Sequence, residues 1–150
     1  ITLRFNYRGV GASAGTHDMA SGEVDDAEAA ATWLRKKHPD LPITLLGFSF
    51  GGYVAASLGG RLEAKGEKLA HLFMVAAAVM RLGDTDVLPQ NCPLTLIQPE
   101  TDEVVDPQRV YDWSAALKRP HELLKVAECG HFFHGKLTDL KDLVLPRLSN

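Results

Sequence analysis

The sequence is short of the features that define several classes of protein. Its 150 residues contain two cysteines, Cys92 and Cys129, which are too few for a disulfide framework. Its longest apolar stretch, residues 69–80, is shorter than a membrane span. Acidic residues outnumber basic ones, 19 to 16, and the densest basic cluster lies at the end of an expected helix. We therefore expect no membrane span, no nucleic-acid surface and two thiols in a reducing, cytoplasmic compartment.

Apolar strand patterns alternate with helical patterns along the chain. Strands are expected at residues 1–7, 42–48, 69–79, 93–99 and 121–127. Helices are expected at residues 21–38, 50–65 and 106–118, and around Leu137, Leu140 and Val144, where Pro146 limits the last one. This alternation predicts an α/β fold, with a mostly parallel sheet of about five strands flanked by helices in one domain, residues 1–150.

A serine between glycines stands where an expected strand meets an expected helix. Residues 47–51 read Gly-Phe-Ser-Phe-Gly, so Ser49 would lie on a sharp turn that lifts its hydroxyl above the sheet. Gly47 and Gly51 would avoid collisions within that turn. The backbone N–H of Phe50, at the first turn of the helix, would face a developing oxyanion. The pattern predicts a nucleophile, whereas a merely glycine-rich turn is the alternative.

A serine nucleophile needs a base and a carboxylate, and two later loops offer both. Each loop follows an expected strand, and parallel sheets place their sites at the carboxyl ends of strands. The first loop offers four carboxylates, Glu100, Asp102, Glu103 and Asp106. Asp106 has a structural role available as the N-cap of a helix, and Glu100 and Glu103 are interpreted as solvated side chains. The second loop offers two histidines, His131 and His134.

Four motifs together give the chain a resemblance to a known superfamily. "FNYRGVGAS", "GFSFGG", "TDEVVDP" and "GHFFHG" come in the order of the corresponding α/β-hydrolase loops. The chain resembles the small, lidless bacterial serine hydrolases of that superfamily, in the dienelactone-hydrolase-like group of uncharacterised esterases. The resemblance implies that Ser49 is the nucleophile, Asp102 the acid and His131 the base. It leaves His134 as a supporting or surface residue.

The resemblance also implies parts that the sequence does not contain. The family's sheet has eight strands, and its strand order would make residues 1–7 the fourth. We therefore expect an N-terminally incomplete domain, the C-terminal two-thirds to three-quarters of the usual one. It would lack the second oxyanion donor, and loss of one such donor costs about 10²–10³ in rate. Residues 80–92 are too few to hold a lid.

These expectations point to hydrolysis of small acyl esters or thioesters through a Ser-His-Asp triad and an acyl-enzyme. Phe48 and Phe132 are candidate walls of the substrate pocket, and no metal or organic cofactor is implied. The expected partner is a small acyl substrate, with neither nucleic acid nor membrane involved. A non-catalytic binding or scaffold domain and a cofactor-free perhydrolase remain alternatives. The segment 9–14, which matches a weak dinucleotide fingerprint, is set aside because the next helix begins too late.

Overall fold

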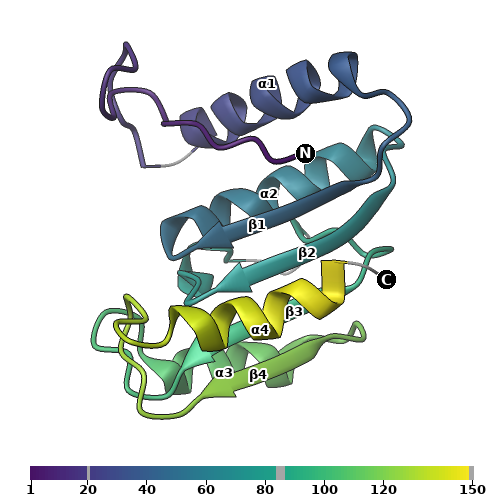
Figure 1. The fold of residues 1–150 in the computed structure, drawn as a ribbon. Coiled ribbons are helices and arrows are strands. Elements are labelled where there is room, and N and C mark those ends of the chain that lie inside the picture. The colour runs from purple at the N-terminus through teal and green to yellow at the C-terminus, as the bar shows by residue number, and fades with distance from the viewer. Residues whose placement is uncertain (20, 84–86, 149–150) are drawn as a thin grey trace. The chain divides into compact units, whose positions relative to one another are not determined.

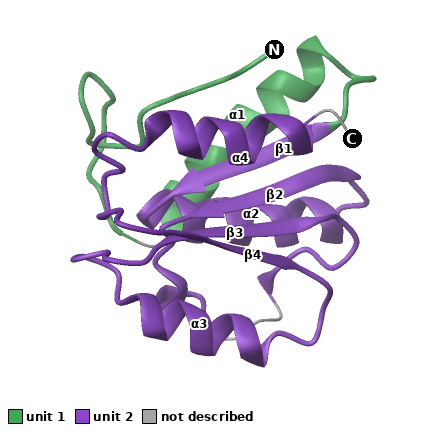
Figure 2. Ribbon diagram, turned by 60° about the horizontal axis from the view of Figure 1, so that its bottom comes forward, with its two compact units in different colours: residues 1–42 green, residues 43–150 purple. Residues whose placement is uncertain are grey.

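The protein is described by a computed structural model that covers residues 1–19, 21–83 and 87–148. The described residues form two compact units, residues 1–42 and residues 43–150 (Figure 2). The serine motif and both of the loops that follow it belong to the second unit. None of the helices formed by the described residues has the length and apolarity that a membrane crossing requires.

The first unit contains one helix, α1 (Ser21–Lys37), preceded by an irregular segment. Acidic Glu23 lies in its first turn and three basic residues lie in its last, as the helix dipole favours. Before the helix, the guanidinium of Arg8 donates to the carboxylate of Asp26, with the Nη2–Oδ1 distance at 2.8 Å. This pair ties the irregular segment to α1.

The prediction of a strand at residues 1–7 is wrong. These residues are assigned no regular structure, and residues 1–6 are exposed. The alternation of Ile1, Leu3, Phe5 and Tyr7 gives the right side-chain period for a strand. A strand also needs backbone hydrogen bonds to a neighbour, and no strand of the described residues pairs with this segment.

The second unit is built on a parallel sheet with four strands rather than about five. Its strands, in spatial order, are β1 (Ile43–Phe48), β2 (Leu69–Val75), β3 (Leu94–Pro99) and β4 (Glu122–Val126) (Figure 1). Because all four run the same way, their carboxyl ends meet at one edge of the sheet. The loops that carry the candidate site residues all start from this edge.

Helices cover both faces of the sheet (Figure 1). The elements are α2 (Phe50–Ala64) and α3 (Pro107–Ala116) on one face, α4 (Leu137–Leu148) on the other, and a short 3₁₀ turn, η1 (Val79–Arg81). Strand β2 supplies both cores, with Leu72 and Met74 facing one way and Phe73 and Val75 the other. Cys92 belongs to the first core and Cys129 to the second, and both are free thiols.

Two local predictions about helix ends have different outcomes. Asp106 caps α3 as expected, because its side chain accepts the N–H of Gln108 at 3.0 Å and Pro107 is the first helical residue. Pro146 does not end the last helix, since α4 continues to Leu148. A proline in the final turn removes one hydrogen-bond donor, and its fixed φ still suits a helix.

Candidate active site

Ser49 occupies the turn between β1 and α2 in a backbone conformation that is unusual for a residue with a side chain. Its φ is 54° and its ψ is −118°. Such strain costs about 1–3 kcal/mol and persists only where neighbours hold it in place. Here the Ser49 N–H donates to the carbonyl of Val75 at 2.9 Å, and its carbonyl accepts from Ala78 at 3.1 Å. The end of β2 therefore holds the serine turn.

Glycine at position 47 has a steric reason. A Cβ built on Gly47 would overlap the backbone carbonyl of Gly51. The structure adds a second requirement that sequence reasoning did not single out, since a Cβ at Gly52 would overlap the side chain of Ala77. The turn is thus tight enough to bring the first residues of α2 directly over the end of β1.

His131 lies between Ser49 and Asp102. The Nε2 atom of His131 is 3.0 Å from the Ser49 hydroxyl oxygen. Its Nδ1 atom is 3.0 and 2.9 Å from the two carboxylate oxygens of Asp102. His131 and Asp102 are both buried, at 2% and 8% exposure. We call these three side chains the serine site.

The geometry of the serine site sets the direction of proton movement. A carboxylate can only accept hydrogen bonds, so the Nδ1 of His131 carries the proton that faces Asp102. The Nε2 atom then has a lone pair directed at the hydroxyl of Ser49. This arrangement can take the proton of the serine as its oxygen attacks an electrophile.

The carboxylate of Asp102 has further partners that fix its orientation. Its Oδ1 accepts the backbone N–H groups of Val104 and Val105 at 2.9 and 2.8 Å. Its Oδ2 accepts the side-chain amide of Gln98 at 3.2 Å. Gln98 is fully buried at 0% exposure and lies near the end of β3. Sequence reasoning missed Gln98, although an amide in a mostly apolar strand was a visible signal.

The competing carboxylates and the second histidine lie elsewhere or contact different atoms. Asp106 caps α3, Glu100 is exposed, and His134 is exposed with its ring 6.0 Å from that of Phe132. Glu103 is exposed but is not simply solvated, because its Oε2 accepts the backbone N–H of His131 at 3.0 Å. That hydrogen bond is the main reason why the pKa of Glu103 lies below its usual value.

Phe50 is the first residue of α2, directly after Ser49. Its backbone N–H therefore lies at the positive end of the helix dipole. The role of this group as an oxyanion donor stays a prediction.

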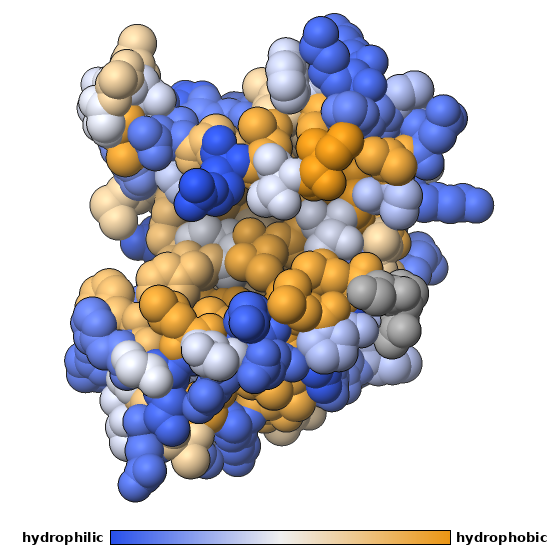
Figure 3. Space-filling view, viewed as in Figure 1, coloured by the Kyte–Doolittle hydropathy of each residue, from blue (hydrophilic) through white to orange (hydrophobic). Residues whose placement is uncertain are grey.

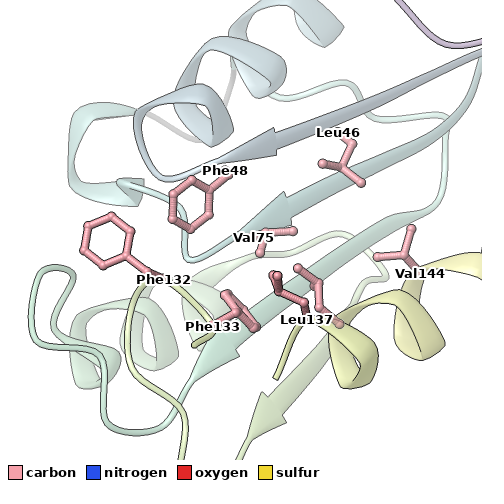
Figure 4. Close-up of a pocket in the computed structure, with 8 residues that line it drawn as sticks. Leu46, Phe48, Val75, Phe132, Phe133, Leu137 and Val144 are labelled. Carbon is pink, nitrogen blue, oxygen red and sulfur yellow. The ribbon is translucent and has the colours of Figure 1, made fainter. Parts of the chain in front are cut away.

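Phe48 and Phe132 flank the imidazole of His131. Their ring centroids are 4.9 and 5.0 Å from that of His131. Both also line an apolar cavity of about 250 Å³, together with Leu46, Val75, Phe133, Leu137, Leu140 and Val144 (Figure 4). In the space-filling view, apolar side chains gather over the sheet face between β1 and α4 (Figure 3). The two candidate pocket residues thus connect the serine site to an apolar surface.

No metal-binding cluster is found in the part of the chain that the structure describes. Within residues 1–19, 21–83 and 87–148, no group of three or more His, Cys, Asp or Glu side chains is placed to hold an ion.

Comparison with solved structures gives close matches over nearly the whole chain. A lidless α/β serine hydrolase from Xanthomonas campestris is 38% identical, with a TM-score of 0.86, over 97% of this chain and 64% of its own. An α/β serine hydrolase homologue from Coxiella burnetii is 35% identical, with a TM-score of 0.85, over 97% of this chain and 67% of its own. This chain belongs to the α/β hydrolase family.

Other comparisons agree with this assignment. The family model of the Thioesterase domain matches residues 15–86 of this α/β hydrolase. An uncharacterized protein of Rickettsia prowazekii is 30% identical over 95% of this chain and 62% of its own length. The chain therefore spans about two thirds of the length of these relatives.

Proposed function

We propose that this α/β hydrolase cleaves small acyl esters or thioesters by way of an acyl-enzyme on Ser49. The observation that carries the proposal is the 3.0 Å distance from His131 Nε2 to Ser49 Oγ, with Asp102 on the opposite ring nitrogen. Membership of the α/β hydrolase family and the likeness to a serine hydrolase homologue support it, and the partial match to the Thioesterase model supports the inclusion of thioesters.

The reaction would proceed in two steps. In the first, His131 takes the hydroxyl proton of Ser49 as the oxygen attacks the carbonyl carbon, and Asp102 stabilises the imidazolium. The backbone N–H of Phe50 would donate to the resulting oxyanion. His131 then protonates the leaving alcohol or thiol, and the acyl group stays on Ser49. In the second step, water attacks the acyl-enzyme with the same base.

The aromatic residues beside His131 bear on the substrate. Phe48 and Phe132 are 39% and 55% exposed, so their rings present apolar surface next to the imidazole of His131. Their position favours an acyl group with apolar character, and an open site suits small or projecting acyl groups. A perhydrolase would use the same three side chains, whereas a scaffold domain would need none of them.

The proposal predicts turnover that depends on Ser49. A matched pair of substrates, p-nitrophenyl butyrate and its thioester counterpart, would be assayed with the wild type, Ser49→Ala and Ser57→Ala. We expect Ser49→Ala to lower kcat by about 10⁶-fold because the nucleophile is lost. Ser57 lies in the middle of α2 and provides a matched control, whose rates should equal the wild type. Equal rates for the wild type and Ser49→Ala would contradict the proposal.

A further inference from the structure

Two adjacent carboxylates, Asp102 and Glu103, hold His131 at two different points. Asp102 contacts the imidazole Nδ1, and the Oε2 of Glu103 accepts the backbone N–H of the same histidine at 3.0 Å. The first contact orients the ring, while the second fixes the peptide from which the ring projects.

The contact between Glu103 and His131 extends a series of bonds between the two loops. The Glu100 N–H donates to the Val126 carbonyl at 2.9 Å, as a continuation of the β3–β4 ladder. The Thr101 N–H and hydroxyl then donate to the Cys129 carbonyl at 3.1 and 2.9 Å. The Glu103 bond comes last in the series and is the one that acts directly on His131.

Gly130 provides the room that this bond needs. A Cβ built at position 130 would lie 2.8 Å from Oε2 of Glu103, which is too close for an unstrained contact. A side chain there would push the carboxylate aside. The glycine that precedes the histidine thus allows the present position of the Glu103 carboxylate, which a side chain at 130 would displace.

We propose that Glu103 is a positioning residue that fixes the peptide of His131, and through it the distance from Nε2 to the Ser49 hydroxyl. The inference rests on the proposed function. It adds Glu103, as a second acidic residue, to the groups that hold His131 in position. Glu103 touches neither the reacting oxygen nor the ring nitrogens in this arrangement, so it acts through His131. Loss of the bond frees the loop that carries His131 to sample positions in which Nε2 no longer reaches Ser49.

The expected effect is on kcat and not on KM, because Glu103 orients the base and does not line the cavity beside it. Glu103→Ala should lower kcat about tenfold, the scale of one hydrogen bond to a charged group at an exposed site. Glu103→Gln keeps an acceptor oxygen at the same reach, and should restore kcat to within about threefold of the wild type. Glu100→Ala removes a similar exposed charge from the same loop and should leave kcat unchanged.

Gly130→Ala is an independent test, because it moves the carboxylate without removing it. We expect the same fall in kcat as in Glu103→Ala, and no additional loss when the two substitutions are combined, since both break one interaction. Falls in kcat that add up in the double variant would contradict the inference. A Glu103→Ala variant with the kcat of the wild type, or with only a raised KM, would contradict it as well.

Amide hydrogen exchange provides a readout that does not need activity. The His131 N–H should exchange faster in Glu103→Ala than in the wild type, and Glu100→Ala should leave its rate unchanged. If the wild type shows no turnover while this exchange pattern holds, the proposed function fails but the positioning contact stands. Unchanged exchange in Glu103→Ala would overturn the inference even in an active enzyme.

Discussion

The parallel sheet carries a histidine, a hydroxyl and a carboxylate close together at each of its two ends. The order in which the three side chains contact one another differs between the two ends. At the amino end, the Nε2 of His71 lies 2.9 Å from the hydroxyl oxygen of Thr95. That hydroxyl donates in turn to Glu122 at 3.4 Å, and Arg147 binds the same carboxylate through two nitrogens, each at 2.6 Å. At the carboxyl end, the imidazole of the serine site stands between the hydroxyl and the carboxylate.

The order of the three groups is the reason why we propose nucleophilic catalysis at only one of the two ends. In the serine site, the carboxylate of Asp102 keeps the proton of His131 on Nδ1. The Nε2 atom is then left to accept a hydrogen bond from the hydroxyl of Ser49. At the amino end, the hydroxyl is in the middle and the carboxylate is paired with Arg147, so this carboxylate does not orient His71 as a base. Burial, helped by the charge of Arg147, holds the pKa of His71 below its usual value, and its ring stacks on Phe73 at 4.0 Å. Residue types alone therefore do not define a triad.

The largest expected difference between the two ends concerns Asp102. Asp102→Asn keeps the shape of the side chain but lets its amide donate to His131, which favours the wrong tautomer. We expect kcat to fall about 10⁴-fold with little change in KM. Asp106→Asn makes the same chemical change four residues later at a helix cap, where Asn serves as well as Asp. Its kcat should match the wild type, and an equal fall in both variants would show that the loop, not the carboxylate, was responsible.

At the amino end, we expect substitutions to change stability and leave chemistry untouched. Thr95→Val keeps the volume of a residue that is 2% exposed, but removes the hydroxyl that His71 contacts. A buried ring nitrogen left without its partner should cost about 1–3 kcal/mol in the free energy of unfolding. Urea unfolding would measure that loss, and ester hydrolysis should proceed with unchanged kcat. A fall in kcat with an unchanged free energy of unfolding would mean that Thr95, at the amino end of the sheet, affects the serine site at the carboxyl end.

The pH dependence of stability should show the smallest effect. His71 has a lowered pKa in the folded protein, so below its ordinary value of 6.5 the unfolded chain binds the additional proton more readily. The free energy of unfolding should therefore decrease as the pH falls through this range. His71→Gln removes that contribution, while the nearby Glu122–Arg147 pair stays in place. Unfolding of both proteins at successive pH values should give a shallower pH slope for the variant, whereas equal slopes would refute this role of His71.

Much of the fold followed from local patterns in the sequence. Apolar runs and helix signals located all four strands and the helices of the second unit to within a few residues. The prediction of a strand at residues 1–7 failed because the alternation of side chains does not indicate whether a neighbouring strand supplies the hydrogen bonds. Strand β2 is also shorter than expected, because Ala76 adopts a positive φ of 43° and turns the chain away.

The candidate site was partly visible in the sequence. Ser49, Asp102 and His131 follow the ends of β1, β3 and β4, and the structure brings all three into contact. The contact of Gln98 with Asp102 is local, four residues along the chain, and the amide in β3 was its signal in the sequence. The contact of Glu103 could not be predicted, because it depends on how the loops after β3 and β4 lie against each other. The interpretation of Glu103 as a solvated side chain failed for this reason: its exposure was correct, but its partner was a backbone N–H.

The most direct measurement is the site of covalent labelling by a fluorophosphonate, read by peptide mass spectrometry. Such a probe reacts with a serine only where a base removes the hydroxyl proton. We expect one adduct, on Ser49, in the wild type and in Ser57→Ala, and none in His131→Ala. A folded wild-type protein that carries no adduct on Ser49, or one that is labelled equally well without His131, would contradict the central claim that these side chains form a working nucleophile.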